Sequence, residues 1–304
     1  MKKYFRFLAY FLFVLVLLFV IAITLWLALN RTNGKIVSGG ETRRYLLYVP
    51  ESYDPSEPTP LVINIHGFAQ WPANQMRVSQ WNELADEEGF IVVYPSGTGF
   101  PLRWRVSEDS AYPGGQENEI AFISDLIDKL SDEFNIDSAR VYANGLSNGG
   151  GMSLLLACEL SDRITAVGGV AGAYLFDLEN CHPQRLVPAI FFHGKADQIV
   201  PFNGSPSERF ELLFSKISEF VHSYAQKNAC DLNPQTVMNT ANVRGIYYSG
   251  CRENADIHFY SIEDGGHTWP GGSPLPERIT GKTSQEIDAT QLMWEFFQEF
   301  SIDD

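Results

Sequence analysis

Short apolar runs alternate along the chain with segments in which apolar residues recur every three or four positions. The runs are typical of buried strands, and the periodic segments are typical of helices with one buried face. The predicted strands are Arg44–Pro50, Leu61–His66, Phe90–Tyr94, Arg140–Asn144, Ala166–Val170, Ala189–His193 and Ile257–Ile262. The predicted helices are Trp81–Glu88, Glu119–Phe134, Ser147–Leu160, Phe210–Lys227 and Ser284–Phe300. This alternation predicts an α/β fold with a mostly parallel sheet and helices on both faces.

The amino-terminal segment has a different pattern. Phe7–Leu29 contains no charged residue, and a helix over it would span roughly 34 Å, which suffices for a bilayer core. Lys2, Lys3 and Arg6 precede it and favour a cytoplasmic amino terminus. We therefore expect one transmembrane signal-anchor. A cleaved signal peptide is the alternative, although its apolar core is usually only about 7–15 residues long. Both alternatives place the rest of the chain in the periplasm or outside the cell.

The sequence predicts three parts. Residues 1–29 form the cytoplasmic tail and anchor, residues 30–41 a polar linker, and residues 42–304 one catalytic domain. Hydrophobic residues make up 45% of the 304 residues, which suffices for a large core. Phe100–Glu117, rich in Gly, Pro and Ser, is interpreted as a loop near the functional site.

The charge balance excludes one class of partner. A formal net charge of −15 and the absence of a basic run oppose binding to a nucleic acid. The sequence contains no signal from which the oligomeric state can be inferred.

Four cysteines follow the apolar segment, and their even number in an exported domain predicts two disulfides. Pairing of nearest neighbours gives Cys158–Cys181 and Cys230–Cys251. Four buried free thiols are the alternative. No pair has the C-x-x-C spacing, so a zinc ribbon or a redox motif has no support.

The strongest chemical motif is Asn144-Gly145-Leu146-Ser147-Asn148-Gly149. It follows a predicted strand and opens a predicted helix, which is the setting of a nucleophile elbow. The tight turn raises the hydroxyl of Ser147 above the sheet, and glycines allow the strand and the helix to approach closely. Ser147 is therefore the candidate nucleophile.

A nucleophilic serine needs a base and an acid that orients the base, and in this motif's fold the order along the chain is Ser, Asp or Glu, His. His267 follows a predicted strand and lies in a glycine-rich loop, so it is the candidate base. Asp197 follows the preceding predicted strand and is the candidate acid. Asp264 is a rival, but it lies only three residues before His267. Two backbone N–H groups, of Asn148 and Phe68, are the expected oxyanion hole.

These motifs resemble the exported α/β-hydrolase esterases that include polyhydroxybutyrate depolymerases and the feruloyl esterases of carbohydrate esterase family one. The resemblance extends from about Glu41 to Phe300 and is most specific at Gly266-His267-Thr268-Trp269-Pro270-Gly271. It implies acyl transfer by a Ser-Asp-His triad without a cofactor or metal. It also implies that Trp269 lines the substrate cleft, with Trp104 and Gln70 as weaker candidates. The chain departs from the family at Glu117-Asn118-Glu119, where many relatives have paired aspartates, and at Gly150-Gly151-Met152.

The sequence therefore predicts a serine esterase that acts on small or polymeric carboxylic esters. A peptidase or an acyltransferase on the same fold is an alternative within catalysis. A binding module that has lost activity is a third alternative, although all three triad residues are present.

Overall fold

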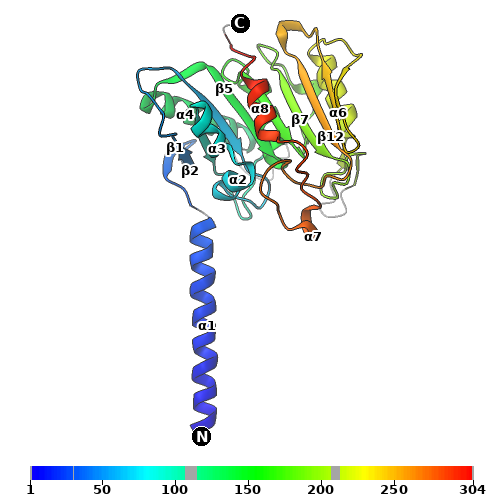
Figure 1. Ribbon diagram of the computed structural model, residues 1–304. Coiled ribbons are helices and arrows are strands. Elements are labelled where there is room, and N and C mark those ends of the chain that lie inside the picture. Colours follow the sequence, from blue (N-terminus) through cyan, green and yellow to red (C-terminus); the bar gives the residue numbers. More distant parts are fainter. Residues whose placement is uncertain (1, 30, 107–114, 207–212, 303–304) are drawn as a thin grey trace.

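The protein is described by a computed structural model that covers residues 2–29, 31–106, 115–206 and 213–302. Its main feature is a ten-stranded sheet in the order β1-β2-β4-β3-β5-β6-β7-β12-β11-β10 (Figure 1). These strands are β1 (Gly34–Ser38), β2 (Glu41–Tyr48), β3 (Thr59–Ile65), β4 (Ile91–Pro95), β5 (Ile136–Leu146), β6 (Ala166–Val170), β7 (Ala189–Gly194), β10 (Gln235–Asn239), β11 (Val243–Tyr248) and β12 (Ile257–Ile262). Two further short strands, β8 (Ser205–Pro206) and β9 (Leu213–Phe214), pair with each other.

The six strands β4, β3, β5, β6, β7 and β12 are parallel and form the middle of the sheet. Antiparallel pairs extend it at both ends, β1 with β2 on one side and β10 with β11 on the other. The parallel strands β3, β4, β6 and β7 are buried along their whole length, as their continuous apolar runs predict. The predicted α/β class with a mostly parallel sheet is confirmed.

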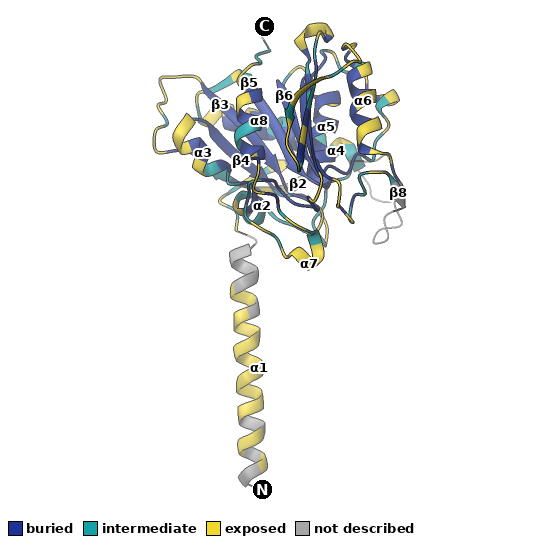
Figure 2. Cartoon of the chain, turned by 45° about the vertical axis from the view of Figure 1, so that its right-hand side comes forward, coloured by how far each residue is buried: buried dark blue, intermediate teal, exposed yellow. Residues whose placement is uncertain are grey.

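Helices cover both faces of the sheet. The apolar side chains of α4 (Gly115–Glu133), α5 (Asn148–Glu159) and α6 (Ile217–Lys227) form one core with one face. Those of α2 (Pro72–Ser79), α3 (Trp81–Glu88) and α8 (Ala289–Phe297) form a second core with the other face. Figure 2 shows the buried sheet between these two layers. The shorter helices are α7 (Glu277–Thr280), η1 (Leu178–Asn180) and η2 (Arg252–Asn254).

Some elements differ from the sequence prediction. β1 lies within residues 30–41, the segment interpreted as a linker, and pairs with β2. The helix predicted over Phe210–Lys227 begins at Ile217, and residues 210–212 lie outside the described residues. Residues 107–114 of the predicted loop Phe100–Glu117 also lie outside them. The division of the chain into domains stays a prediction.

The helix α1 (Lys2–Leu29) extends away from the body of the molecule, and its described side chains are exposed (Figures 1 and 2). A helix that crosses a bilayer needs about 20 consecutive, predominantly apolar residues. Among the residues that the structure describes, no helix combines the length and the apolar character that a crossing requires. The prediction of a transmembrane helix over Phe7–Leu29 is therefore wrong.

The segment after α8 returns to the start of β5. The phenol of Tyr142 donates a hydrogen bond to the carbonyl of Phe300 at 3.0 Å, and the N–H of Ile302 donates to the carbonyl of Ala139 at 3.1 Å. Phe297 of α8 stacks on Tyr142 with 4.8 Å between ring centroids. Residues far apart in the sequence therefore close this side of the second core.

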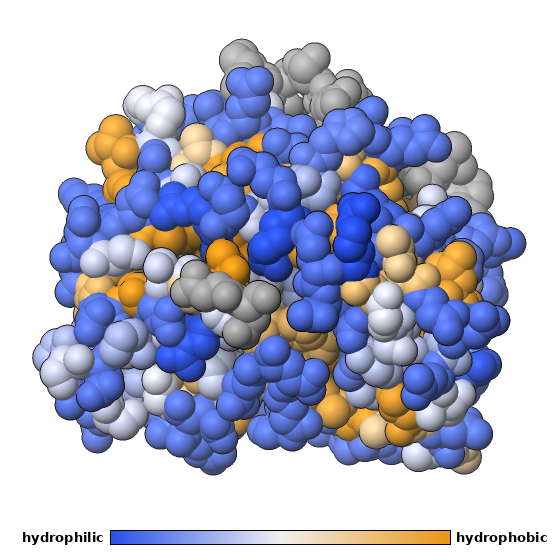
Figure 3. Space-filling view, turned by 90° about the horizontal axis from the view of Figure 1, so that it is seen from above, coloured by the Kyte–Doolittle hydropathy of each residue, from blue (hydrophilic) through white to orange (hydrophobic). Residues whose placement is uncertain are grey.

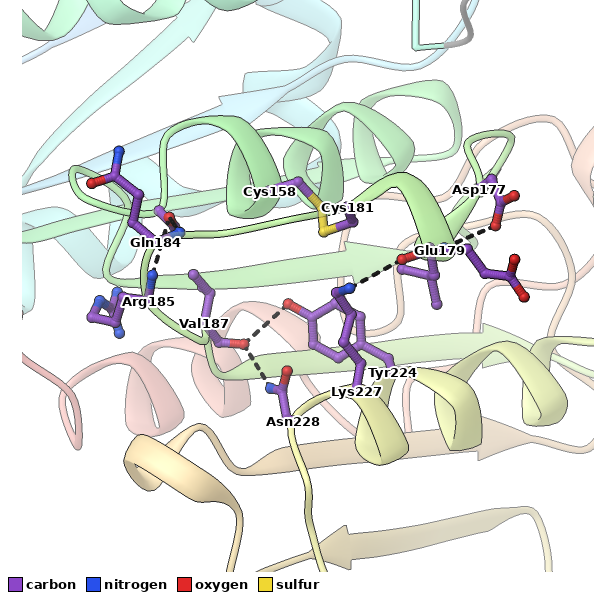
Figure 4. The surroundings of a disulfide bond; sticks show 12 residues. Cys158, Asp177, Glu179, Cys181, Gln184, Arg185, Val187, Tyr224, Lys227 and Asn228 are labelled. Atoms are coloured by element: carbon purple, nitrogen blue, oxygen red, sulfur yellow. Dashed lines mark hydrogen bonds between the residues drawn. A yellow bond between two sulfur atoms is a disulfide. The ribbon is translucent and has the colours of Figure 1, made fainter.

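Both predicted disulfides are present. Cys158–Cys181 links α5 to the segment that follows β6, and Cys230–Cys251 links the end of α6 to the end of β11. Around the first bond, Lys227 donates to the carbonyl of Leu178, and Tyr224 and Asn228 both donate to the carbonyl of Val187 (Figure 4). The disulfide therefore lies in a region where α6, β7 and the loop before β7 are already connected.

The face turned away from α1 carries mostly hydrophilic side chains, with smaller hydrophobic areas between them (Figure 3). This distribution is consistent with a chain of net charge −15.

Candidate functional site

The turn at Ser147 has the geometry of a nucleophile elbow. β5 ends at Leu146, α5 begins at Asn148, and Ser147 between them has φ 58° and ψ −118°. A non-glycine residue in this region of backbone space is strained. The two flanking glycines make the turn possible, because a Cβ on Gly149 would lie 2.1 Å from the carbonyl oxygen of Ile65, and one on Gly145 would lie 2.5 Å from the backbone of Gly149.

Backbone hydrogen bonds from the neighbouring strand hold the strained turn. The N–H of Ser147 donates to the carbonyl of Val170 at 2.9 Å, which continues the pairing of β5 with β6. The carbonyl of Ser147 accepts from the N–H of Gly151 at 3.0 Å and from that of Ala173 at 2.9 Å. Ser147 as a whole residue is 9% exposed, so it lies at the rim of the core.

Asp197 and His267 are in direct contact, although 70 positions separate them in the sequence. Nδ1 of His267 lies 2.7 Å from Oδ2 of Asp197. Both residues are buried, with 6% of His267 and 4% of Asp197 exposed. The other carboxylate oxygen, Oδ1, accepts from the N–H groups of Ile199 at 2.8 Å and Val200 at 2.9 Å. These bonds fix the carboxylate, which in turn fixes the orientation of the imidazole.

The electrostatics favour an ionised Asp197. Burial opposes ionisation, but the nearby His267 and His193 and the hydrogen bond from Val200 outweigh it, so the pKa of Asp197 lies below its ordinary value. An ionised carboxylate beside Nδ1 favours the tautomer in which Nδ1 carries the proton. Nε2 of His267 is then available to accept a proton from a hydroxyl group.

A second histidine lies beside the same carboxylate, which the sequence did not indicate. Nε2 of His193 lies 3.4 Å from Oδ2 of Asp197 and 2.9 Å from the carbonyl oxygen of Val200. His193 is buried, and burial lowers its pKa. Its position at the carboxyl end of β7, four residues before Asp197, was the available signal.

The topology accounts for the meeting of these loops. Ser147, Asp197 and His267 follow the carboxyl ends of β5, β7 and β12, respectively. β7 pairs with β12, and β6 alone separates β5 from β7. Because all four strands are parallel, the three loops leave the sheet at the same edge. Figure 1 shows α2 and α7, which follow the loops after β3 and β12, at that common edge.

The two segments predicted to form the oxyanion hole adjoin the elbow. Asn148 is the first residue of α5, where backbone N–H groups have no acceptor within the helix. Gly67 lies against the elbow, since a Cβ on it would be 3.3 Å from both the carbonyl of Leu146 and Cβ of Ser147. The next residue, Phe68, is 39% exposed. Both backbone segments therefore border the serine.

The three residues predicted to contact the substrate lie in different environments. Trp269 is fully buried in the second core and donates its indole N–H to the hydroxyl of Thr290 at 2.9 Å, so it does not line an open cleft. Trp104 is also buried, and its indole N–H donates to the carbonyl of His66 at 3.0 Å. Gln70 is partly exposed and accepts from the side chain of Asn74 at 3.1 Å. Of the three, Gln70 alone keeps the accessibility that a substrate contact needs.

A cavity of about 770 Å³ lies between the segment 174–179 and α6. None of the predicted site residues lines it. In the described part of the chain, no group of three or more His, Cys, Asp or Glu side chains could hold a metal ion.

Comparison with known proteins finds similarity to esterases. The family described as "Esterase PHB depolymerase" matches residues 43–182. The "Bifunctional acetylxylan esterase/xylanase XynS20E" of Neocallimastix patriciarum is 27% identical over 87% of this chain, and "Feruloyl esterase B" of Piromyces equi is 25% identical over 86%. The matches cover 34% and 46% of those two relatives, so this chain spans less than half of their length.

A solved structure described as "Acetyl xylan esterase from Aspergillus awamori" has the same fold. It aligns with a TM-score of 0.59 and 16% identity over 87% of this chain and 98% of that chain. At this identity the similarity concerns the fold alone.

Proposed function

We propose that this chain, which is similar to α/β-hydrolase esterases, hydrolyses carboxylic esters, with Ser147 as nucleophile, His267 as base and Asp197 as the orienting acid. The observation that carries the proposal is the buried contact of 2.7 Å between His267 and Asp197, at the same edge of the sheet as the strained turn of Ser147.

In the proposed reaction, Oγ of Ser147 attacks the ester carbonyl while Nε2 of His267 accepts the hydroxyl proton. The resulting oxyanion binds the N–H groups of Phe68 and Asn148. The intermediate then expels the alcohol, which takes the proton from His267. Water, deprotonated by the same nitrogen, attacks the acyl-enzyme and releases the carboxylic acid and free Ser147.

Acetyl and feruloyl esters are the proposed substrate class, because the relatives are named as acetylxylan and feruloyl esterases. The proposed catalytic unit comprises residues 42–304 together with β1, which belongs to the same sheet. We further propose that it works outside the cytoplasm, since two disulfides persist in oxidising compartments.

The direct test compares wild type and Ser147→Ala with p-nitrophenyl acetate and with a fluorophosphonate that labels activated serines. We expect turnover and labelling in the wild type and the loss of both in the variant. Undiminished turnover by Ser147→Ala would refute the proposal. A panel of an acetylated xylan, methyl ferulate, a hydroxybutyrate oligomer and a peptide then identifies the substrate, and cleavage of the peptide alone would indicate a peptidase.

A further inference from the structure

One loop connects the two backbone segments that border Ser147. This bridging loop comprises residues 97–104, between β4 and α4. It makes hydrogen bonds to the segment 66–69 on one side and to Asn148 on the other. These are the two segments that supply the oxyanion hole in the proposed function.

On the first side, three hydrogen bonds join the bridging loop to the turn after β3. The N–H of Gly97 donates to Nε2 of His66 at 2.9 Å, and the indole N–H of Trp104 donates to the carbonyl of His66 at 3.0 Å. The N–H of Ala69 donates to the carbonyl of Leu102 at 2.8 Å. Phe68 lies between His66 and Ala69, so the bonds hold the backbone on both sides of the predicted oxyanion donor.

On the second side, the side chain of Asn148 forms a reciprocal pair with the backbone of Trp104. Oδ1 of Asn148 accepts from the N–H of Trp104 at 2.7 Å, and Nδ2 donates to the carbonyl of Trp104 at 3.0 Å. The carboxamide supplies an acceptor and a donor on neighbouring atoms, which matches the C=O and N–H of one backbone residue. Because Asn148 is the first residue of α5, the pair fixes the loop against the end of the helix that carries the second predicted donor.

The bridging loop is supported from beneath by α4. The hydroxyl of Thr98 donates to Oε1 of the fully buried Glu119 at 3.1 Å, and Oε2 of Glu119 pairs with Arg43 at 2.6 Å. The guanidinium of Arg43 lies over the ring of Phe122, 4.0 Å from its centroid, and the indole of Trp104 is nearly parallel to the same ring, with 6.4 Å between centroids. The loop is therefore held by a buried ion pair and by stacked planar groups, which limits its movement.

We propose that the bridging loop sets the spacing of the oxyanion hole, and that the carboxamide of Asn148 and the indole N–H of Trp104 are its positioning groups. This inference rests on the proposed function. Neither group touches the reacting ester. They fix the distance and direction between two backbone donors, and stabilisation of an oxyanion depends on donors that are already in place when the charge develops.

The test uses Asn148→Ala, which removes both bonds to the loop backbone, and Trp104→Phe, which removes the N–H and keeps a ring against Phe122. Active sites are counted by fluorophosphonate labelling, so that turnover is expressed per competent site. We expect kcat on p-nitrophenyl acetate to fall about 10- to 100-fold in each variant. Removal of a whole oxyanion donor lowers kcat by about 100- to 1,000-fold, and these variants displace the donors without removing them. KM should stay within about twofold, because the donors act mainly in the transition state.

A second measurement addresses the oxyanion directly. A trifluoromethyl ketone adds to the serine and forms a tetrahedral oxyanion, so its affinity should fall by the same factor as kcat/KM. The double variant should lose less than the product of the two single losses, since both substitutions act through one loop.

Asn228→Ala is the matched control. Asn228 is a buried asparagine whose amide donates to the carbonyls of Val187 and Ala255, and it lies outside the proposed site. Its loss should lower stability and leave kcat per labelled site unchanged.

The possible failures are distinguishable. If the wild type is labelled and active but both loop variants keep the wild-type kcat per labelled site, the positioning role is refuted and the esterase proposal stands. If the wild type is not labelled at all, the proposed function fails, and this inference fails with it.

Discussion

His267 and Asp197 lie at the ends of two adjacent parallel strands, and Nδ1 of the imidazole is 2.7 Å from the carboxylate that the backbone of Ile199 and Val200 holds in place. Replacement of Asp197 by Asn keeps the shape of the side chain and removes its charge. It then favours the wrong tautomer of His267, and we expect kcat on p-nitrophenyl acetate to fall by about 10⁴-fold.

Asp264→Asn is the matched control for that measurement. Asp264 is largely exposed and pairs with Lys282. Its replacement should change kcat by less than about twofold, because an exposed ion pair contributes little. A loss in Asp264→Asn that equalled the loss in Asp197→Asn would show that the acid has been assigned to the wrong residue.

The close approach of α5 to β3 makes Gly149 indispensable for folding. The methyl group of Gly149→Ala would collide with the carbonyl of Ile65, and backbone atoms cannot move aside without displacing β3. We expect urea-induced unfolding to show a loss of about 3 kcal/mol or more, or no folded protein. Gly89→Ala separates this collision from backbone strain, because Gly89 has φ 76° but open space around it. The free energy of unfolding of Gly89→Ala should fall by about 1 kcal/mol. An equal loss in Gly149→Ala and Gly89→Ala would contradict the steric explanation.

The two disulfides should contribute similarly to stability, since they close loops with sequence separations of 23 and 21. The chain-entropy relation gives about 3 kcal/mol for each. We expect Cys158→Ser/Cys181→Ser and Cys230→Ser/Cys251→Ser each to lower the free energy of unfolding by this amount. Reduction of both disulfides in the wild type should lower the free energy of unfolding more than either double substitution. If a reductant leaves the urea midpoint of the wild type unchanged, the prediction is contradicted.

His66 should make stability depend on pH. Burial lowers its pKa to about 4, although the hydrogen bond to the carbonyl of Gly67 raises it. In the unfolded chain a histidine titrates near about 6.5. Between these two values the unfolded state binds more protons, so stability falls as the pH drops from about 6.5 to about 4, by up to about 3 kcal/mol. Above about 6.5 this residue contributes no pH dependence.

The check is the free energy of unfolding at pH 7 and pH 4.5 for the wild type, His66→Gln and the exposed control His182→Gln. His66→Gln should show a smaller difference between the two pH values than the wild type, and His182→Gln should retain the wild-type difference. Equal differences in all three proteins would exclude His66 as the source.

The alternation of apolar runs and helical periodicity was sufficient to predict the fold class, and the order of the chemical motifs indicated which loops meet. β6, β12 and α3 have the predicted bounds. The contact of Asp197 with His267 follows from parallel strands that end at one edge. The order Ser, Asp, His along the chain identified the two residues.

Other features depended on tertiary contacts that no local pattern records. β10 (Gln235–Asn239) is mostly exposed and lacks the alternation that identifies a strand. α2 buries the polar side chains of Gln75 and Ser79, so its buried face is not apolar in the sequence. Trp269 follows His267 by two positions and Trp104 lies in a loop expected near the site, yet both pack inward and use their indole N–H within the protein. Proximity in sequence to a catalytic residue does not decide which way a side chain points.

The return of the segment 289–302 to β5 has a consequence for biosynthesis. Phe90 and Trp81 of the second core are covered by Trp294 and Phe297, with 4.1 Å and 6.2 Å between the paired centroids. A nascent chain that has emerged from the ribosome only as far as β12 lacks these rings and leaves a broad aromatic surface uncovered. Chaperones that bind exposed apolar surface should therefore remain associated until synthesis has passed residue 302, and folding of this domain should be completed after translation of nearly all of its residues.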